Sequence, residues 1–554
     1  MIDLITNYKS QITKWVKENR LEAFWLAVIL IIGAFFRLYR IDEYMTFLGD
    51  EGRDAIIVRR LLVNFDPILI GPGTSIGNMY LGPIYYYMMA PALLLAGFNP
   101  AGPSVMIALL GVFTMWFVWF VVRGWFPTSP RFRGTSPFSI NVAALGSAAL
   151  YAVSPVVINF SKSSWNPNIM PFFSLLTIYS IWKWWMEGKF KWIVVTAVSI
   201  AFVLQSHYLG LLLVPVVGLF CLLTFLKINR LQITDHRSLK RNFLKYSTFG
   251  IGALTILMLP LLIFDLRHNF MNFNAVKQFF TQRQTTVSAL PWKSIPKLSE
   301  VMNDSTSSLL GAKNVDLTWL FTYGILFFTL WILIRELFSK RKINIKDKKY
   351  WNYLWEKIEN ANLSPYFLLI IWLLTAYVGL GLYKQHIYDH YYGFFFTAPF
   401  ILVGGITQYI LDNFKSYWKI IITIFFIYAI TTNLVGNPLK YPPNRQMQRA
   451  IEVAEKIKGE ARGQKFNLAV IAERNYEDGY QFFLEKWGEP VYDIDALNYE
   501  KTLADNLFVV CEMPKEKCDP VHNPKTEVAN FGWSKVEGEW EVGGITLYKL
   551  IHTQ

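Results

Sequence analysis

Three absences limit what this sequence can encode. Its C-terminal part has no glycine-rich loop of the kind that binds nucleotide phosphates, and nothing else in the chain suggests binding of a soluble nucleotide. The first apolar stretch is long and lacks a small-residue cleavage site, so we expect a retained helix and not a signal peptide. Cysteine is scarce, with three residues among 554. Cys511 and Cys518 could pair in an oxidising compartment, whereas Cys221 lies in an apolar stretch and is expected to be inert.

Long apolar stretches are abundant instead. Hydrophobic residues make up 53% of the chain. Stretches near or above ~18 apolar residues, enough to cross a bilayer as a helix, recur along it. Examples are Leu21–Tyr39 and Pro103–Val122. Because backbone polar groups cannot stay unsatisfied in lipid, these stretches are predicted to be helices, with many of the aromatic residues at the membrane interfaces.

The basic residues set the expected orientation. The formal net charge is +14, and because the chain from Lys440 onward holds 15 basic and 19 acidic residues, the part before it carries +18. That surplus lies mainly in short loops, which fits the positive-inside rule far better than it fits nucleic-acid binding. Basic residues before the first span put the N-terminus in the cytoplasm and segment 42–82 outside. We therefore expect a multi-pass protein of the inner (plasma) membrane.

Alternation of basic loops predicts about eleven spans. The apolar piece Pro83–Phe98 is short and contains two prolines, so we interpret it as an interfacial or re-entrant helix. Besides the two stretches above, spans are expected near 138–160, 168–186, 191–206, 208–226, 246–265, 315–336, 365–383, 392–411 and 418–436. Loops expected inside are 123–133, 183–191, 227–245, 337–364 and 411–419. Loops expected outside are 161–167, 266–314 and 384–391.

The segment 437–554 differs in kind and is expected outside, because the number of spans is odd. Arg449–Lys458 fits a short amphipathic helix, and a second helix is expected over Tyr476–Trp487. Strands are predicted at Phe466–Ala472, Leu507–Cys511 and Gly544–Leu550. The predicted fold is therefore an all-α polytopic membrane domain over residues 1–436, followed by a small soluble α/β domain over residues 437–554.

The first outer loop carries an acidic motif, Gly49-Asp50-Glu51-Gly52-Arg53. Asp50 could be the N-cap of an amphipathic helix on the membrane surface, with Glu51 and Asp54 favouring its first turn. Asp50 could also carry chemistry. The two interpretations are compatible, because a capped helix is a rigid mount for an exposed carboxylate.

Three motifs follow one another along the chain. The first is D-E-x-R-x-A at Asp50–Ala55, and the second is the aromatic, proline-containing stretch Leu81–Tyr87. The third is Ser161–Asn168, in which a basic residue precedes an Asn-Pro step. Together they resemble the glycosyltransferase C superfamily, in particular its protein O-mannosyltransferases, which use polyprenyl- or dolichyl-phosphate-mannose, and its lipid A aminoarabinose transferases. The resemblance covers residues 20–230 and is looser through residue 436.

Enzymes of this superfamily transfer a sugar from a polyprenyl-phosphate carrier to an acceptor, with inversion at the anomeric centre. The resemblance implies that Asp50 is the general base that takes the proton of the acceptor. Arg53 and Lys162 are the candidates to stabilise the leaving phosphate. Glu51 would position the acceptor or help to hold a divalent metal. The expected partners are a polyprenyl-phosphate sugar donor, the bilayer, and a protein, lipid or glycan acceptor.

The sequence departs from the family pattern at two places. Aminoarabinose transferases have a lysine that meets the lipid phosphate just before the proline, where this chain has Leu81 and Gly82. The second acidic residue of the outer face is replaced by Asn166, which is a poorer cation ligand. A divalent metal cofactor is therefore disfavoured, and Asn166 is kept as a candidate for substrate binding.

Further candidates for donor or acceptor binding lie at other outer ends of spans. They are His207, Arg267, His268, His390 and Tyr85. Each also has a plainer interpretation as a helix end or an interfacial aromatic residue. Loop 266–314 is long enough to cover the site or to select the acceptor.

Two other functions stay open at this point. A transporter or flippase of lipid-linked sugars would more often show paired hydrophobic repeats and ionisable residues in mid-span, and we find no clear repeat. A non-catalytic scaffold would explain the C-terminal part, but it would leave the Asp50 cluster with no role beyond helix capping.

Overall fold

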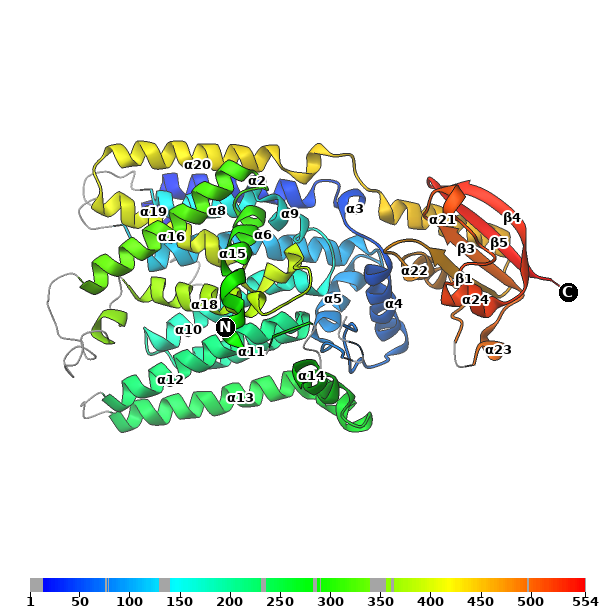
Figure 1. Cartoon of the computed structure of the whole chain (residues 1–554), viewed down its shortest axis with the longest axis horizontal. Helices are drawn as coiled ribbons and strands as arrows, with labels where there is room; N and C mark the ends of the chain where they lie inside the picture. The colour runs from blue at the N-terminus through cyan, green and yellow to red at the C-terminus, as the bar shows by residue number, and fades with distance from the viewer. Residues whose placement is uncertain are drawn as a thin grey trace.

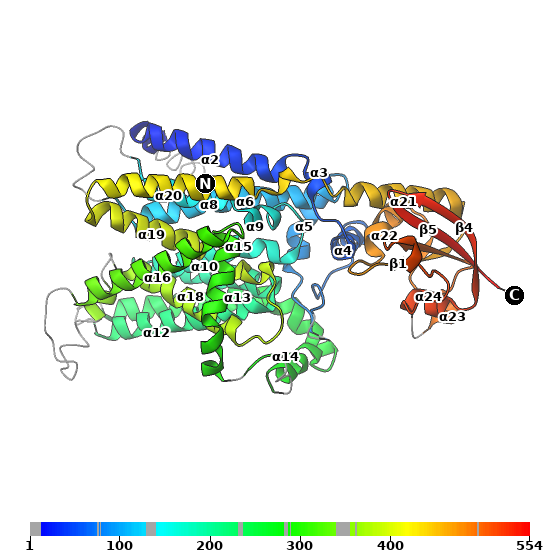
Figure 2. The same ribbon diagram turned by 45° about the horizontal axis from the view of Figure 1, so that its top comes forward.

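The computed structural model describes residues 13–74, 77, 79–128, 140–230, 236–281, 286–288, 290–338, 355–359, 363–495 and 498–553. Parts of the loops 123–133, 227–245 and 337–364, expected inside, and of loop 266–314, expected outside, lie beyond these residues. The long helices run side by side along the molecule, and a small sheet lies at one end of the bundle (Figures 1 and 2).

Seven helices in the described part of the chain are long and apolar enough to cross a membrane. These are α2 (Arg20–Leu38), α6 (Ala101–Trp125), η2 with α12 (Tyr208–Leu213 and Val214–Arg230), most of α13 (His236–Arg267), most of α16 (Val315–Phe338), α18 (Ser364–Gly381) and α20 (Tyr417–Val435). An eighth candidate is the pair η4 (Asp389–Phe395) and α19 (Thr397–Asn413), which is bent by 57°. The protein is therefore a mostly helical multi-pass membrane protein.

The predicted number of about eleven spans stays a prediction. The regions 138–160, 168–186 and 191–206 do form helices, but each helix is shorter than 18 residues. They are α8 (Val142–Val153) with α9 (Pro155–Asn159), α10 (Met170–Trp185) after η1 (Asn166–Ile169), and α11 (Trp192–Ser206). Pro155 interrupts the first of these regions, because it begins α9 and the backbone of Ser154 is extended.

A buried arginine joins the first span to this interrupted helix. The Arg37 side chain is fully buried, and its Nη1 donates to the carbonyl oxygens of Gly33 at 2.9 Å and Ala152 at 3.0 Å. Its Nη2 donates to the carbonyl oxygen of Tyr151 at 3.4 Å. Arg37 thereby satisfies carbonyls at the C-terminal end of α8, which a helix cannot satisfy itself. It also fixes the C-terminal half of α2 against the end of α8, and thereby the start of the segments that follow α2 and α9.

The segment between α2 and α6, which the charge pattern predicts to be outside and which we call the first outer loop, is built of short helices. They are α3 (Ile41–Tyr44), α4 (Gly49–Asn64) and α5 (Ile84–Leu95). The last of these confirms that the apolar piece at 83–98 is a short helix. Other short helices beside the long ones are α14 (Met271–Thr281), η3 (Pro291–Lys297) and α15 (Leu298–Leu309).

The C-terminal part forms a five-stranded sheet in the order β2-β1-β3-β5-β4. Strand β1 is parallel to β2 and β3, whereas β5 is antiparallel to β3 and β4. The strands are β1 (Phe466–Ile471), β2 (Val491–Tyr492), β3 (Asn506–Cys511), β4 (Ser534–Val542) and β5 (Ile545–His552). The helices are η5 (Pro438–Lys440), α21 (Gln446–Ala461), α22 (Asp478–Lys486), α23 (Tyr499–Thr502), η6 (Lys515–Lys517) and α24 (Thr526–Phe531).

The sheet shares a hydrophobic core with the first outer loop. One face of the sheet contributes Phe466, Phe508 and Leu547 to a cluster that also contains Ala55 of α4 and Tyr86 of α5. The opposite face packs against α24 in a separate, smaller cluster. Because apolar contacts are continuous from α5 through α4 to the sheet, the C-terminal part holds the first outer loop in place.

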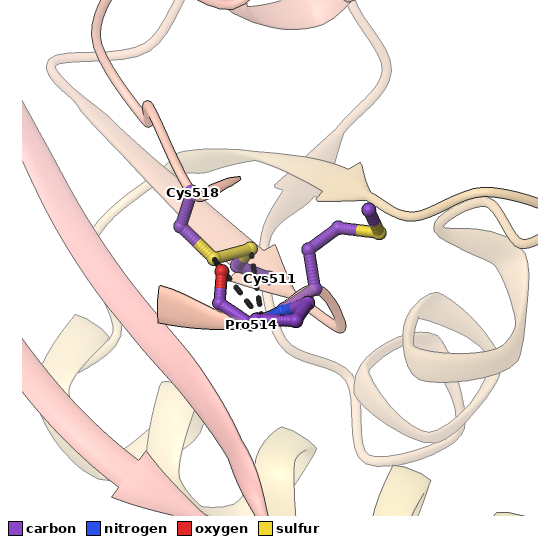
Figure 3. Close-up of a disulfide and its surroundings, with 4 residues drawn as sticks. Cys511, Pro514 and Cys518 are labelled. Atoms are coloured by element: carbon purple, nitrogen blue, oxygen red, sulfur yellow. Dashed lines mark hydrogen bonds between the residues drawn. A yellow bond between two sulfur atoms is a disulfide. The ribbon is translucent and has the colours of Figure 1, made fainter. Parts of the chain in front are cut away.

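A disulfide closes the turn that follows β3. Cys511, the last residue of β3, is bonded to Cys518 seven residues further along (Figure 3). Glu512 follows Cys511 directly, so the disulfide constrains the segment that carries this carboxylate. Cys221 is free, as expected.

Candidate functional site

The acidic motif of the first outer loop forms the first turn of α4. Helix α4 starts at Gly49, so Asp50 is its second residue and Leu48 is the N-cap. The prediction that Asp50 is the N-cap is therefore wrong. Glu51 takes the capping role, because its Oε2 accepts a hydrogen bond of 3.0 Å from the backbone N–H of Leu48. Asp50 is left free to project from the helix start.

Glu51 is buried beneath this turn. Only 8% of the residue is exposed, and burial raises the pKa of its carboxyl to about 7. The backbone N–H of Leu48 opposes this shift, and the nearby charge of Asp50 adds to it. Glu51 therefore changes its charge near neutral pH while it holds the start of α4.

Arg53 bridges the two aspartates of the helix. Its Nη1 donates to Asp50 Oδ1 at 2.8 Å, and its Nε and Nη2 donate to Asp54 Oδ1 at 3.1 and 2.7 Å. Asp54 is fully buried and also accepts a hydrogen bond of 2.9 Å from the hydroxyl of Tyr86 in α5. Arg53 is thus fixed by a buried carboxylate on one side and orients Asp50 on the other.

The segment between β1 and α22 reaches the same carboxylate from the C-terminal part. The Tyr476 hydroxyl donates a hydrogen bond to Asp50 Oδ1 and accepts one of 3.3 Å from Arg53 Nη1. Asn475 Oδ1 accepts a hydrogen bond of 2.8 Å from the backbone N–H of Gly49. Asn475 is held in turn by Glu512, at 2.6 Å. Both contacts on Asp50 use Oδ1, and 44% of the Asp50 side chain is exposed.

The two glycines of the motif allow this close approach. A Cβ atom on Gly49 would lie 2.4 Å from the ring of Tyr476. A Cβ atom on Gly52 would lie 2.4 Å from the backbone of Asp478 and of Gly479. Such distances are shorter than any real carbon contact, so glycine is required at both positions for the C-terminal segment to dock on α4.

Two cavities meet at Asp50. The first has a volume of about 430 Å³ and lies between the first outer loop, the segment after α9 and the C-terminal part. The second has about 260 Å³ and lies between the start of α4 and the helix ends near residues 166, 207 and 390. Asp50 and Trp165 line both cavities. A third cavity of about 390 Å³ follows α4 and also contains Arg53.

The residues that the sequence predicts for the site line two different cavities. Glu51 and Lys162 line the first cavity. Arg53, Asn166, His207 and His390 line the second. The structure therefore places Lys162 and Arg53, both proposed from the sequence to meet one phosphate, in different cavities that adjoin at Asp50.

Three of the predicted residues line none of these cavities. Tyr85 is fully buried, and its hydroxyl lies 2.7 Å from Ser164 Oγ, so its role in donor or acceptor binding stays a prediction. Arg267 and His268 lie exposed at the end of α13. The His268 ring stacks on Phe264.

His207 presents a neutral ring to the second cavity. Its Nδ1 accepts a hydrogen bond of 3.2 Å from the backbone N–H of Leu209. Burial lowers the pKa of His207 to about 3, and the neighbouring His390 adds to this shift. The neutral ring therefore carries its proton on Nε2, which makes that nitrogen a hydrogen-bond donor. The ring centroids of His207 and His390 are 5.8 Å apart, and Trp165 lies edge-on to His390 at 4.7 Å.

Asn166 supports the same wall of the second cavity, because its Nδ2 donates a hydrogen bond of 2.5 Å to the carbonyl oxygen of Ser206. That contact leaves the amide oxygen of Asn166 as its acceptor group. Among the described residues, no group of three or more His, Cys, Asp or Glu side chains could hold a metal ion.

Known proteins resemble this chain in sequence and in fold. Residues 133–276 match the model of a family described as dolichyl-phosphate-mannose-protein mannosyltransferase. The crystal structure of ArnT from Cupriavidus metallidurans bound to undecaprenyl phosphate aligns with 97% of this chain and 98% of its own, at 13% identity and a TM-score of 0.56. The apo structure of the same protein aligns over the same shares at 12% identity and a TM-score of 0.55. The fold is that of ArnT.

A further solved structure and the curated proteins were also compared with this chain. The structure of the Saccharomyces cerevisiae Pmt1–Pmt2 complex bound to the sugar donor aligns with 45% of this chain and 34% of its own, at 19% identity and a TM-score of 0.32. No curated protein matches the sequence. The resemblance to protein mannosyltransferases and aminoarabinose transferases that the sequence motifs suggested is thus confirmed.

The sequence motifs do not reveal Tyr476, Asn475 or Asp54. Tyr476 and Asn475 lie more than 420 residues from Asp50, in a part of the chain without a motif of its own. Asp54 directly follows Arg53, and the sequence treats it as one more first-turn acid. The one local signal for the docking of Tyr476 and Asn475 is the pair of glycines at positions 49 and 52, since glycine inside a helix start costs stability unless a close contact needs it.

The contact at Gly52 can be tested by adding one methyl group. We expect Gly52→Ala to destabilise the protein by about 1–3 kcal/mol, because α4 and α22 must separate to admit the Cβ atom. Thermal unfolding of the detergent-solubilised protein measures the effect. Gly124→Ala, also in a helix but with no atom within 4 Å of the added Cβ, is the matched control and should not destabilise. Equal behaviour of the two variants would contradict the close docking of the C-terminal segment.

The buried carboxyl of Glu51 predicts a pH effect on stability. Its pKa of about 7 in the folded protein lies above the usual value of 4.5. The folded state therefore holds a proton that the unfolded state releases, and the wild type loses stability as the pH rises between these two values. Glu51→Gln cannot titrate, so its melting temperature relative to the wild type should rise from pH 5 to pH 8. Glu516→Gln, at an exposed position, should show no such trend. If the melting temperature of Glu51→Gln relative to the wild type does not change with pH, the raised pKa of Glu51 is refuted.

Proposed function

We propose that this protein is an integral-membrane, inverting glycosyltransferase. It moves a monosaccharide from a polyprenyl-phosphate donor to an acceptor at the outer face of the membrane. The observation that carries the proposal is the position of Asp50, an oriented and partly exposed carboxylate at the boundary of two cavities. This arrangement suits a transfer reaction, because an acceptor hydroxyl held at the base in one cavity can face the anomeric carbon of a donor held in the other.

The comparisons support the kind of donor. The family matched by residues 133–276 is described by its dolichyl-phosphate-mannose donor, and the ArnT structure that shares this fold contains undecaprenyl phosphate. Both compounds are long isoprenoid phosphates. A donor of this class suits a multi-pass protein, because its lipid tail stays in the bilayer while its phosphate reaches the outer ends of the helices.

Asp50 is suited to act as the general base. Arg53 and Tyr476 both bind Oδ1, and no described residue donates a hydrogen bond to Oδ2. Oδ2 is therefore the oxygen that takes the proton from the acceptor hydroxyl as the acceptor oxygen attacks the anomeric carbon. The bond from that carbon to the phosphate oxygen breaks, and the phosphate leaves with the electron pair. Attack from the side opposite the phosphate inverts the anomeric centre.

We assign the donor phosphate to the second cavity. Arg53 brings a cation to its edge, and the neutral His207 offers an Nε2–H donor. Hydrogen-bond donors that are fixed before the reaction stabilise the charge that develops on the leaving phosphate. His390 lines the same wall and would meet the same group.

The disulfide supports the proposed orientation. Disulfides form and persist in oxidising compartments and are rare in the cytosol. The bond between Cys511 and Cys518 therefore favours a C-terminal part outside the cell membrane. With the basic residues before α2 in the cytoplasm, the protein would span the inner (plasma) membrane with its active site facing outward.

The role of Asp50 as a base can be tested in proteoliposomes. The donors are polyprenyl phosphates that carry radiolabelled mannose, glucose or aminoarabinose, and envelope lipids and proteins are the acceptors. We expect Asp50→Asn to lower the transfer rate by about 10²- to 10⁴-fold, because general-base catalysis is lost. Asp505→Asn, an exposed change far from the cavities, is the control. If Asp50→Asn transfers as fast as the wild type, the base is another residue.

Tyr476 should affect the reaction through Asp50. Its hydroxyl and Arg53 together hold Asp50 Oδ1, so we expect Tyr476→Phe to lower kcat by about 10-fold, because the carboxylate is less well oriented toward the acceptor. The loss should be smaller than in Asp50→Asn. Tyr492→Phe, an exposed tyrosine of the C-terminal sheet, should leave kcat unchanged. An unchanged kcat in Tyr476→Phe would show that Tyr476 only packs against α4.

A further inference from the structure

Lys162 is a buried cation without an acidic partner. Only 6% of the residue is exposed, and its ammonium lies 5.2 Å from the centre of the Tyr44 ring. No carboxylate of the described residues comes within 4.0 Å of it, and burial alone lowers the pKa of Lys162 to about 8. A buried charge is costly unless it is paired. The Lys162 side chain lines the first cavity, so a partner can reach it only there.

The other charges of this cavity do not compensate Lys162. Asp50 is already paired with Arg53, at 2.8 Å. Glu51 Oε2 already accepts a hydrogen bond from the backbone of Leu48, and burial raises the pKa of this carboxyl to about 7, which weakens its negative charge near neutral pH. The remaining charged residue is Arg474, which comes from the C-terminal part and forms no ion pair with any described carboxylate. The cavity therefore presents two unpaired cations.

The rest of the lining suits a sugar or another polar ring. Trp165 and Tyr476 supply aromatic surface to the lining. Asn159, Asn168 and Asn444 add polar amide side chains to it. Few, fixed polar groups set among aromatic surface are typical of small-molecule sites. The cavity volume of about 430 Å³ also lies in the range for such sites.

We propose that the first cavity is the acceptor subsite and that it takes an acceptor bearing a phosphate or carboxylate group, held by Lys162 and Arg474. The acceptor hydroxyl then lies at Asp50, opposite the donor cavity. This inference rests on the proposed glycosyl transfer. It changes the role that the sequence suggests for Lys162, from the leaving phosphate of the donor to the anionic group of the acceptor.

The experiment measures how fast the Lys162 amine is acetylated in the wild-type protein. Full-length protein in nanodiscs, with polyprenyl phosphate already bound, is treated with limiting N-hydroxysuccinimidyl acetate, and peptides are quantified by mass spectrometry. The probes are inorganic phosphate, glucuronate and the uncharged methyl glucoside. An anion at twice its dissociation constant should slow acetylation of Lys162 about threefold, since only free protein reacts. Methyl glucoside carries no charge and should not slow the acetylation of Lys162 threefold.

An internal control separates binding from a general salt effect. Lys465 lies over the ring of Tyr492 at 5.0 Å, a similar contact far from the cavity, and its acetylation should not change. Protection by phosphate but not by glucuronate assigns a phosphate-bearing acceptor, and the reverse assigns an acidic sugar. Arg474→Gln should weaken the protection. Asp50→Asn should keep it, so this result does not depend on whether transfer itself is detected.

Three outcomes would overturn the proposal. In the first, neither anion slows acetylation of Lys162. In the second, Lys465 is slowed to the same degree, which would show a salt effect. In the third, protection appears only without polyprenyl phosphate, which would show that Lys162 belongs to the donor side.

Discussion

The ion pair between Arg53 and the buried Asp54 is the interaction on which the rest of the site depends. Asp54 has no exposed surface, and its only described partners are Arg53 and the Tyr86 hydroxyl of α5. Loss of Arg53 would leave a buried carboxylate without a cation, which costs several kcal/mol. The pair fixes the direction of the guanidinium, and the hydrogen bond from Tyr86 to Asp54 ties α4 to α5. The Nε and Nη2 atoms of Arg53 bind Asp54, and its Nη1 atom orients Asp50.

The C-terminal part completes this arrangement from the other side. Asn475 holds the first residue of α4, and Tyr476 shares Asp50 Oδ1 with Arg53. Gly49 lets the ring of Tyr476 approach α4, and Gly52 lets the backbone of α22 approach it. We propose that residues 1–436 and 437–554 act as one catalytic unit, although their compositions differ. The disulfide at Cys511 constrains the neighbouring Glu512, and Glu512 holds the Asn475 side chain that binds the start of α4.

Much of the fold could be predicted from the sequence, because hydrophobic length and charge report directly on local structure. The short helix at Ile84–Leu95 and the strands β1, β3 and β5 all lie where the patterns place them. Strand β4 was missed because it is an exposed edge with a register shift at Gly538, and its pattern is therefore weak. The N-cap was misassigned because aspartate favours both the cap and the first turn, and only tertiary contacts decide between them. Tyr476 could not be found because no local pattern links residues so distant in sequence.

The two cavities differ in charge, and this difference follows from the residues that line them. The apolar Leu81, just before the Gly82-Pro83 step, lines the second cavity. The one Lys or Arg among the described lining residues of that cavity is Arg53, whose charge two aspartates share. A donor phosphate there would be stabilised more by neutral hydrogen-bond donors such as His207 Nε2–H than by net positive charge. The unshared positive charge lies instead at Lys162, on the opposite side of Asp50. An anion on the acceptor would thus be attracted to one side of the base, while the leaving phosphate departs on the other.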